Sequence, residues 1–447
     1  MDRGPHVKYS VITFGCRVNQ ADSLAIESEL CSRGAEATSA DKADVVVVNT
    51  CSVTASADQG ARQTIRRIAR DNPSARIIAT GCYASRCADE VAALPGVVRV
   101  VPNAEKDAQT FVATFLGREA IATGVTEGPC GRPLAPGLMG RTAWTLRAQT
   151  GCEEACSYCI IPTTRGAGRS RAIGEIREEV ARVVAAGYKE IAITGVHLGS
   201  YGRDLEPRSS LDELLQSLTG WAPSSSAEAE PNRSVNKVLF RMSSLEPMDC
   251  TPQIVHQIEA ATAVGHSGGR DCSPAGASGR PANRFAPHFH LPLQHASDRV
   301  LQLMKRPYSL GYYSTLVDTI RARMPHAAIG SDVIAGFPGE TDEDFELLTS
   351  YLECSPLTHL HVFPYSDRPG TVASTLSGKI HGSVIKSRAQ RLREISRVLA
   401  DRFRAAQAGT TRPALTIEDG SVAVTDNYFR VPAPPGHARN EWVRVIL

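Results

Sequence analysis

The sequence contains no long hydrophobic run. Its densest apolar segment, residues 45–48, is only four valines long, far short of the roughly 18 to 20 apolar residues of a membrane helix. The first ten residues, MDRGPHVKYS, lack the apolar stretch of a secretory signal peptide. These absences argue against a membrane protein, so we expect a cytoplasmic protein with no membrane partner.

Glycine and proline are also too scarce for a collagen-like or wholly disordered chain, at 36 and 27 residues. Hydrophobic residues make up 42% and charged residues 21% of the sequence, which is ordinary for a globular protein. A length of 447 residues exceeds that of one ordinary domain. We therefore expect two or three globular domains.

There is little net charge, since the total is only +2. The charge is nevertheless uneven: residues 379–447 carry 12 basic and 6 acidic side chains, whereas residues 141–378 carry 22 and 26. A basic C-terminal part suggests a polyanionic partner such as nucleic acid. A solvated cationic face explains the charge equally well.

The sequence contains twelve cysteines. In a reducing compartment this number favours metal binding or catalysis over a disulfide framework. Half of the cysteines have no motif around them, and we expect these to be structural. They are Cys31, Cys87, Cys130, Cys250, Cys272 and Cys354.

Residues 1–120 alternate between strand-like and helix-like runs. Strands are expected at 9–14, 45–49 and 76–80, and helices at 21–33 and 58–71. This α/β alternation predicts an open parallel sheet with helices on its faces. Cys16, Cys51 and Cys82 directly follow the three strands, at the edge where such sheets bind ligands. We therefore expect the three thiols to converge.

A second alternating pattern covers residues 141–383, after a linker rich in glycine and proline at 121–140. It contains about six strand–helix units, which predicts a partial or full barrel of parallel strands. Two segments, 222–234 and 264–286, interrupt the pattern and are expected to be surface insertions.

The chain is expected to end in an amphipathic helix at 384–410 and a small all-β module at 411–447. Apolar residues of the helix gather on one side, which is expected to pack against the barrel. Its polar side carries seven basic residues: Lys386, Arg388, Arg391, Arg393, Arg397, Arg402 and Arg404.

The most specific motif is C-x-x-x-C-x-x-C, formed by Cys152, Cys156 and Cys159. Three thiolates on one loop can hold three irons of a [4Fe-4S] cluster and leave the fourth iron open to a substrate or cofactor. A zinc site completed by a distant residue is the alternative. A separate zinc site made of Cys272 and nearby histidines is not favoured, because His290 is expected in a barrel strand.

This motif, with Tyr158 before its last cysteine, resembles the signature of the radical S-adenosylmethionine superfamily. Thr194-Gly195 and the segment from Ser331 to Glu340 are similar to cofactor-binding segments of that superfamily. The resemblance implies a partial β/α barrel and a cluster whose open iron binds S-adenosylmethionine. Reductive cleavage of the cofactor then yields a 5′-deoxyadenosyl radical. The residues implied to contact the cofactor are Tyr158, Thr194, Gly195, Ser243, Asp332 and Gly336.

The N-terminal cysteines narrow the resemblance. The segments FGCRVN, NTC and GCY around Cys16, Cys51 and Cys82 resemble the N-terminal domain of the methylthiotransferases. In that family the three cysteines hold a second [4Fe-4S] cluster, which presents sulfur for transfer. The resemblance extends over nearly the whole chain, including residues 241–247, 304–308 and 363–366.

Arg17 and Val18, after the first cysteine, resemble the branch that acts on N6-threonylcarbamoyladenosine next to the tRNA anticodon. This implies replacement of the hydrogen at the adenine C-2 carbon by a methylthio group. Implied partners are the tRNA anticodon loop, bound in part by a C-terminal module of the TRAM type, and an electron donor such as flavodoxin or ferredoxin. Alternatives are the isopentenyladenosine branch, the branch that modifies a ribosomal-protein aspartate, and a non-catalytic iron–sulfur RNA-binding or redox-sensing protein.

Overall fold

The computed structural model describes residues 7–106, 111–112, 135–137, 140–219, 221, 238–263 and 284–447. The chain forms two compact units. Unit 1 contains Met1–Leu134, Thr150–Gly168 and Ser366–Ser374, and unit 2 contains Ala135–Gln149, Arg169–Tyr365 and Thr375–Leu447. Most of the expected linker and insertions lies outside the described residues, and the expected domain boundaries stay a prediction.

Unit 1 is built on a five-stranded parallel sheet with the strand order β2-β1-β3-β4-β5. The strands are β1 (Lys8–Thr13), β2 (Glu36–Ala37), β3 (Val45–Thr50), β4 (Arg76–Gly81) and β5 (Val97–Val101). The three strands predicted from the sequence, β1, β3 and β4, are adjacent in this sheet. Every residue of β3 is buried, as expected for a central parallel strand.

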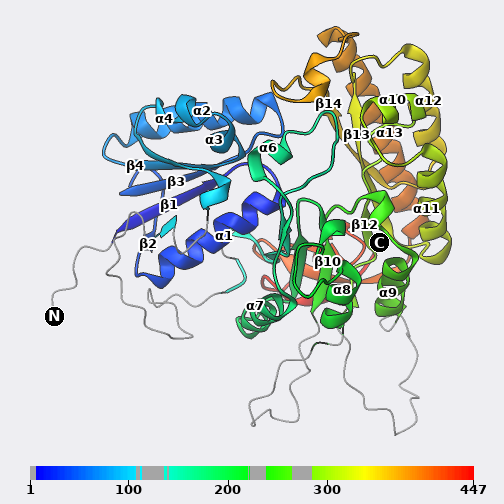
Figure 1. Cartoon of the computed structure of the whole chain (residues 1–447). Helices are drawn as coiled ribbons and strands as arrows, with labels where there is room; N and C mark the ends of the chain where they lie inside the picture. The colour runs from blue at the N-terminus through cyan, green and yellow to red at the C-terminus, as the bar shows by residue number, and fades with distance from the viewer. Residues whose placement is uncertain are drawn as a thin grey trace, which may run out of the picture. The chain divides into compact units, whose positions relative to one another are not determined.

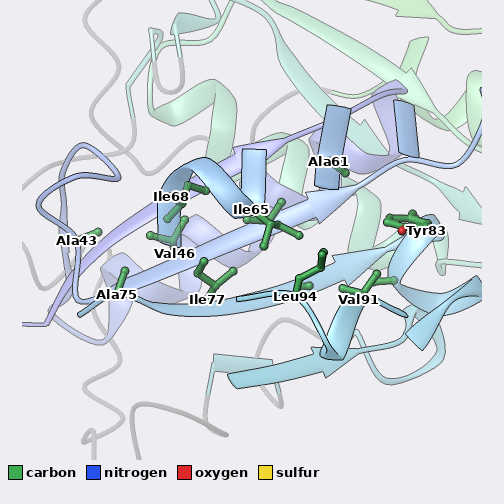
Figure 2. Packing of buried hydrophobic residues seen from close by; sticks show 13 residues of the cluster. Ala43, Val46, Ala61, Ile65, Ile68, Ala75, Ile77, Tyr83, Val91 and Leu94 are labelled. Atoms are coloured by element: carbon green, nitrogen blue, oxygen red, sulfur yellow. The ribbon is translucent and has the colours of Figure 1, made fainter. Parts of the chain in front are cut away.

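Helices cover both faces of this sheet (Figure 1). They are α1 (Arg17–Ser32), α2 (Ala55–Asp71), α3 (Cys82–Arg86) and α4 (Ala88–Ala92). Figure 2 shows Ile65 and Ile68 of α2 packed on Val46 of β3 and Ile77 of β4. The alternate residues of β3, including Val47, pack with α1 on the opposite face.

Unit 2 contains two parallel sheets, ordered β11-β10-β9-β6 and β12-β13-β14. Their strands are β6 (Trp144–Arg147), β9 (Glu190–Thr194), β10 (Leu239–Met242), β11 (Arg284–Phe285), β12 (His288–His290), β13 (Ala328–Ala335) and β14 (His359–Pro364). The Leu245 amide donates to the His290 carbonyl oxygen at 2.9 Å, which joins the segment after β10 to the last residue of β12. The two sheets form a partial barrel, as expected.

Helices alternate with these strands: α7 (Ile173–Ala185), α8 (Leu211–Thr219), α9 (Pro252–Ala263), α10 (Asp298–Leu303), α11 (Leu310–Arg323) and α12 (Asp342–Cys354). The start of α12 is a capping box, in which Thr341 and Asp344 satisfy each other's backbone amides. Shorter elements are β7 (Gln149–Thr150), α6 (Ile161–Arg165), β8 (Arg169–Ser170), η1 (Asn103–Glu105), η3 (Leu198–Ser200), η4 (Pro247–Asp249) and η5 (Val372–Thr375).

Helix α13 (Gly382–Gln407) buries Leu392, Ile395 and Leu399, as its apolar periodicity predicts. Ser396 Oγ accepts a hydrogen bond of 2.9 Å from the Leu360 amide of β14, so this side faces the barrel. The assignment of Arg388 to the exposed polar side is wrong. Its side chain is only 8% exposed and pairs with Glu340 at 2.6 Å.

The C-terminal module is an antiparallel sheet ordered β17-β16-β15-β18. Its strands are β15 (Thr411–Ile417), β16 (Val422–Thr425), β17 (Arg430–Pro432) and β18 (Trp442–Ile446). This confirms the expected all-β end of the chain. Among the described residues, none of the helices combines the length and the hydropathy that crossing a membrane requires.

Candidate iron–sulfur and cofactor site

Three cysteines lie at the carboxyl edge of the unit 1 sheet. Cys16 comes after β1, Cys51 directly follows β3, and Cys82 directly follows β4. Because these strands are parallel neighbours, their ends meet at one edge. The structure therefore brings the three predicted residues together.

Two glycines make this convergence possible. Gly15 has a φ of +87°, and a Cβ added to it would lie 2.3 Å from Cys51 Sγ. Gly81 has a φ of +95°, and its Cβ would lie 2.1 Å from the Thr50 carbonyl oxygen. Glycine adopts this conformation without a steric penalty. Glycine at positions 15 and 81 therefore allows the chain to bring Cys16 and Cys82 against the end of β3.

The three thiols influence one another electrostatically. Burial, together with the neighbouring Cys16 and Cys82, raises the pKa of Cys51 to about 11. Cys82 is also buried, whereas Cys16 is exposed. A bound metal would take the place of the thiol protons, since cysteine binds metals as the thiolate.

The donor set fits an iron–sulfur cluster. All ten described cysteines are free thiols, and thiolates are the ligands that such clusters use. Asn103 Nδ2 donates to Cys82 Sγ at 3.6 Å, and hydrogen bonds to the sulfurs are a feature of cluster sites. Three converging thiols with one buried pair and one exposed member suit a cluster that is open on one side.

The second cysteine set lies on the loop between β7 and α6. The Glu154 amide donates to Cys152 Sγ and the Ile161 amide donates to Cys159 Sγ, each at 3.4 Å. The Cys159 amide donates to the Cys156 carbonyl oxygen at 3.1 Å, which closes the turn between these two cysteines. All three thiols are half-buried. The loop thus carries three half-buried cysteines, two of whose sulfurs already accept backbone hydrogen bonds, as cluster ligands do.

This loop is held within unit 1. The Cys152 amide donates to the Gly166 carbonyl oxygen at 3.0 Å, and the Ala373 amide donates to the Ser157 carbonyl oxygen at 2.7 Å. Asn103 Nδ2 donates to the Thr164 carbonyl oxygen at 2.9 Å as well as to Cys82. Both cysteine sets therefore belong to the same compact unit.

Buried polar residues hold the sheet edge that carries Cys16, Cys51 and Cys82. The sequence patterns did not single out most of them. Asn19 Nδ2 donates to the carbonyl oxygens of Phe14 and Thr50, each at 2.9 Å. Lys106 Nζ donates to Asn49 Oδ1 at 2.8 Å. The only sequence signal was the position of Asn19 and Asn49 beside cysteines. Nothing local marked Lys106 or Arg165, whose partners are far away in the sequence.

The residues expected to contact the cofactor fall in both units. Tyr158 is half-buried in the unit 1 loop. In unit 2, Thr194 ends β9, Gly195 and Ser243 follow strands, Asp332 lies within β13, and Gly336 follows it. Ser243 Oγ is buried without a hydrogen-bond partner among the described residues. These positions are polar or small and lie on or just after parallel strands, where ligands bind, but their contact with the cofactor stays a proposal.

Asp332 has partners that the sequence did not reveal. His290 Nε2 lies 3.0 Å and His361 Nδ1 lies 3.2 Å from its Oδ1. Burial opposes ionisation of Asp332, but these two histidines outweigh it and lower its pKa to about 2. The triad comes from three adjacent strands, and its ligand atoms all lie within 4.8 Å of one another. His290 Nε2 and His361 Nδ1 also lie 3.2 Å from each other.

Comparison with known proteins identifies the relatives of this chain. Residues 8–102 match the model of a family described as the uncharacterized protein family UPF0004. The chain is 31% identical to a threonylcarbamoyladenosine tRNA methylthiotransferase, MtaB, of Bacillus subtilis, over 94% of this chain and 88% of the relative. Identity to the MtaB protein of Aquifex aeolicus is 32%, over 99% and 100% of the two chains. The ribosomal protein uS12 methylthiotransferase RimO of Chloroflexus aurantiacus is 29% identical, over 95% and 91%.

Two solved structures have folds similar to that of this chain. The radical S-adenosylmethionine methyltransferase TsrM of Kitasatospora setae superposes with a TM-score of 0.53 at 14% identity, over 83% of this chain and 75% of that one. The cobalamin-dependent S-adenosylmethionine radical enzyme OxsB gives a TM-score of 0.50 at 10% identity, over 96% and 64%. The chain therefore shares the overall fold of these two enzymes. It belongs to the family of the threonylcarbamoyladenosine tRNA methylthiotransferases.

Proposed function

We propose that this protein replaces the hydrogen at C-2 of N6-threonylcarbamoyladenosine, next to the tRNA anticodon, with a methylthio group. The observation that carries the proposal is that one compact unit of a chain from this family holds both the convergent Cys16, Cys51 and Cys82 and the loop with Cys152, Cys156 and Cys159. Replacing hydrogen on an aromatic carbon is beyond ordinary acid–base catalysis, and cofactors supply such chemistry while the protein positions them.

Each cysteine set has its own proposed role. Cys152, Cys156 and Cys159 would hold the [4Fe-4S] cluster that binds S-adenosylmethionine at its open iron. Cys16, Cys51 and Cys82 would hold a second cluster that presents the sulfur. When bound, the two clusters supply radical generation and sulfur for transfer, respectively. An external electron donor of the flavodoxin or ferredoxin type would supply the reducing electron.

The chain's own residues bind, orient and shield these groups. Burial of Cys51 and Cys82 keeps water from two of the three thiols of the N-terminal set. The amides of Glu154 and Ile161 fix the sulfurs of the loop. In unit 2, the buried Ser243 hydroxyl is available to bind the cofactor, because it has no partner among the described residues.

The two other substrate classes are less well supported. The RimO relative is 29% identical, whereas the two MtaB relatives reach 31% and 32% over similar shares of the chain. Arg17 and Val18, after Cys16, also fit the threonylcarbamoyladenosine branch. We therefore favour this nucleoside over isopentenyladenosine and over a ribosomal-protein aspartate.

Mass spectrometry of nucleosides from the tRNA of a host that lacks the modification tests this function. Expression of the protein should produce the methylthio form of threonylcarbamoyladenosine, and the Cys51→Ala variant should not. A methylthio group on isopentenyladenosine, or no modified nucleoside from protein that contains both clusters, would refute the proposed substrate.

A further inference from the structure

A buried cluster of charges lies behind the N-terminal thiols. Lys106 Nζ lies 3.0 Å from Asp22 Oδ2, and Arg165 Nη2 lies 3.1 Å from the same oxygen. None of the three side chains is more than 3% exposed. One carboxylate thus faces two basic side chains at hydrogen-bond distance.

Buried basic groups are stabilised in their charged form by nearby anions. Arg165 Nε is buried and has no hydrogen-bond acceptor among the described residues. Asn103 Nδ2 donates to the carbonyl oxygen of Thr164, the residue before Arg165, at 2.9 Å and to Cys82 Sγ at 3.6 Å. Arg165 therefore lies beside the N-terminal thiols, where a bound cluster would supply negative charge.

The position of Arg165 connects the two cysteine sets. Its Nη2 donates to Asn19 Oδ1 at 2.5 Å, three residues after Cys16. Its Nη1 donates to Thr150 Oγ1 at 3.1 Å, two residues before Cys152. One guanidinium therefore holds the two segments that carry the first cysteine of each set.

We propose that Arg165 and Lys106 are positioning residues that set the charge balance, and hence the reduction potential, of a cluster on Cys16, Cys51 and Cys82. This inference rests on the proposed function. Three thiolates on a doubly positive [4Fe-4S] core leave one negative charge, and one-electron reduction adds another. A nearby buried cation stabilises the reduced form more than the oxidised form, so it raises the potential.

The test uses the full chain with Cys152, Cys156 and Cys159 replaced by Ala, so that any remaining cluster belongs to the N-terminal set. Iron and sulfide content and a redox titration followed by electron paramagnetic resonance are measured in this parent. Arg165→Met should shift the midpoint potential to more negative values, and Arg165→Lys should stay near the parent. Arg67→Met, an exposed residue of α2, is the matched control and should change nothing.

The possible outcomes are distinct. Cluster loss in Arg165→Met but not in Arg165→Lys supports the inference, because only the charge has been restored. If both Arg165 variants lose the cluster, Lys106→Met decides, and a more negative potential supports the inference. The inference is overturned if Lys106→Met has the same midpoint potential as the parent. It is also overturned if Arg165→Met keeps its full iron content and the parent's midpoint potential. A parent without any cluster shows that the proposed N-terminal cluster is wrong, and this inference then falls with it.

Discussion

Gly15 lies directly against Cys51, so that a Cβ on this glycine would be 2.3 Å from Cys51 Sγ. The turn after β1 therefore has no room for any other residue if the thiols are to converge. This contact explains in physical terms why a glycine precedes the first cysteine of the set. It also identifies the substitution that disturbs the N-terminal site with the smallest change in atoms.

We expect Gly15→Ala to lose most of the iron of the N-terminal cluster. The added methyl group displaces Cys51, and the φ of +87° adds strain of about 1 kcal/mol. Iron and sulfide content, measured with the loop cysteines replaced by Ala, reports the loss. Gly34→Ala is the matched control, because its φ is +82° but its Cβ would meet no described atom within 4 Å. Equal iron loss in both variants would assign the effect to backbone strain instead.

Variants of the two cysteine sets should separate cleavage of S-adenosylmethionine from methylthio transfer. Cys156→Ala should abolish reductive cleavage of S-adenosylmethionine, because the cofactor would lose its cluster. Cys82→Ala should retain cleavage but form no methylthio product. Detection of 5′-deoxyadenosine and of the modified nucleoside in the same reaction checks both statements. Cleavage by Cys156→Ala at the wild-type rate would contradict the assignment of the loop.

Arg241 should be a main source of stability in unit 2. Its guanidinium is 1% exposed, and it donates to Glu190 Oε1 at 2.9 Å and to the Asp426 carbonyl oxygen at 3.0 Å. Arg241→Met leaves the Glu190 carboxylate buried and unpaired, which costs about 3 to 5 kcal/mol. The three tryptophans, Trp144, Trp221 and Trp442, all belong to unit 2, so urea unfolding followed by tryptophan fluorescence reports on this unit.

The matched control for Arg241 removes both charges. Arg241→Met combined with Glu190→Leu should recover part of the lost stability, because no unpaired charge remains in the interior. If the double variant is less stable than Arg241→Met alone, the packing of the two side chains matters more than their charge.

His295 should make unit 2 less stable in mild acid. Burial lowers its pKa to about 4, and Nδ1 accepts a hydrogen bond of 2.9 Å from the Ser297 amide. In the unfolded chain its pKa is about 6.5, so the unfolded state binds the proton first. The stability from neutral His295 is complete above about pH 6.5 and falls as the pH approaches about 4. The loss between pH 7.5 and 5 is about 2 kcal/mol.

Urea unfolding at pH 7.5 and pH 5, followed by tryptophan fluorescence, measures this loss. The His295→Gln variant should lose about 2 kcal/mol less than the wild-type protein over the same interval. Burial also lowers the pKa of His359 to about 4, so a pH dependence should persist in the variant. An unchanged pH dependence in His295→Gln would refute the role of His295.

The sequence was most informative where function depends on local spacing. The strands before Cys16, Cys51 and Cys82 were predictable because apolar runs end in glycine or polar residues at each cysteine. By contrast, Arg165 and Asn19 are 146 residues apart, and no periodicity predicts such a pair. The exposure of Arg388 was misjudged for a related reason, because its buried partner Glu340 comes from a different element.

The exposed cations of α13 should contribute to tRNA binding. Fewer of them are exposed and unpaired than the seven basic residues of its polar side. Lys386, Arg393 and Arg397 are exposed and have no hydrogen bond or ion pair with another described residue. Arg388 is held by Glu340, and Arg402 donates to the carbonyl oxygens of Glu353 and Ser355. Arg391 pairs with Glu353, and Arg404 lies over the ring of Phe429. Lys386, Arg393 and Arg397 are therefore free to neutralise phosphates, which they would do without reading sequence.

Replacing Lys386, Arg393 and Arg397 together by Gln should weaken tRNA binding and make it less dependent on salt. Each lost phosphate contact lowers the slope of log K against log salt by about 0.7 to 0.9, so the triple variant should lose about 2 to 3. Arg402→Gln is the control, because its guanidinium already binds carbonyl oxygens within the protein. Its salt slope should match that of the wild-type protein. An unchanged slope in the triple variant would mean that tRNA phosphates do not lie along this face of α13, and that its charge serves only to keep the helix surface solvated.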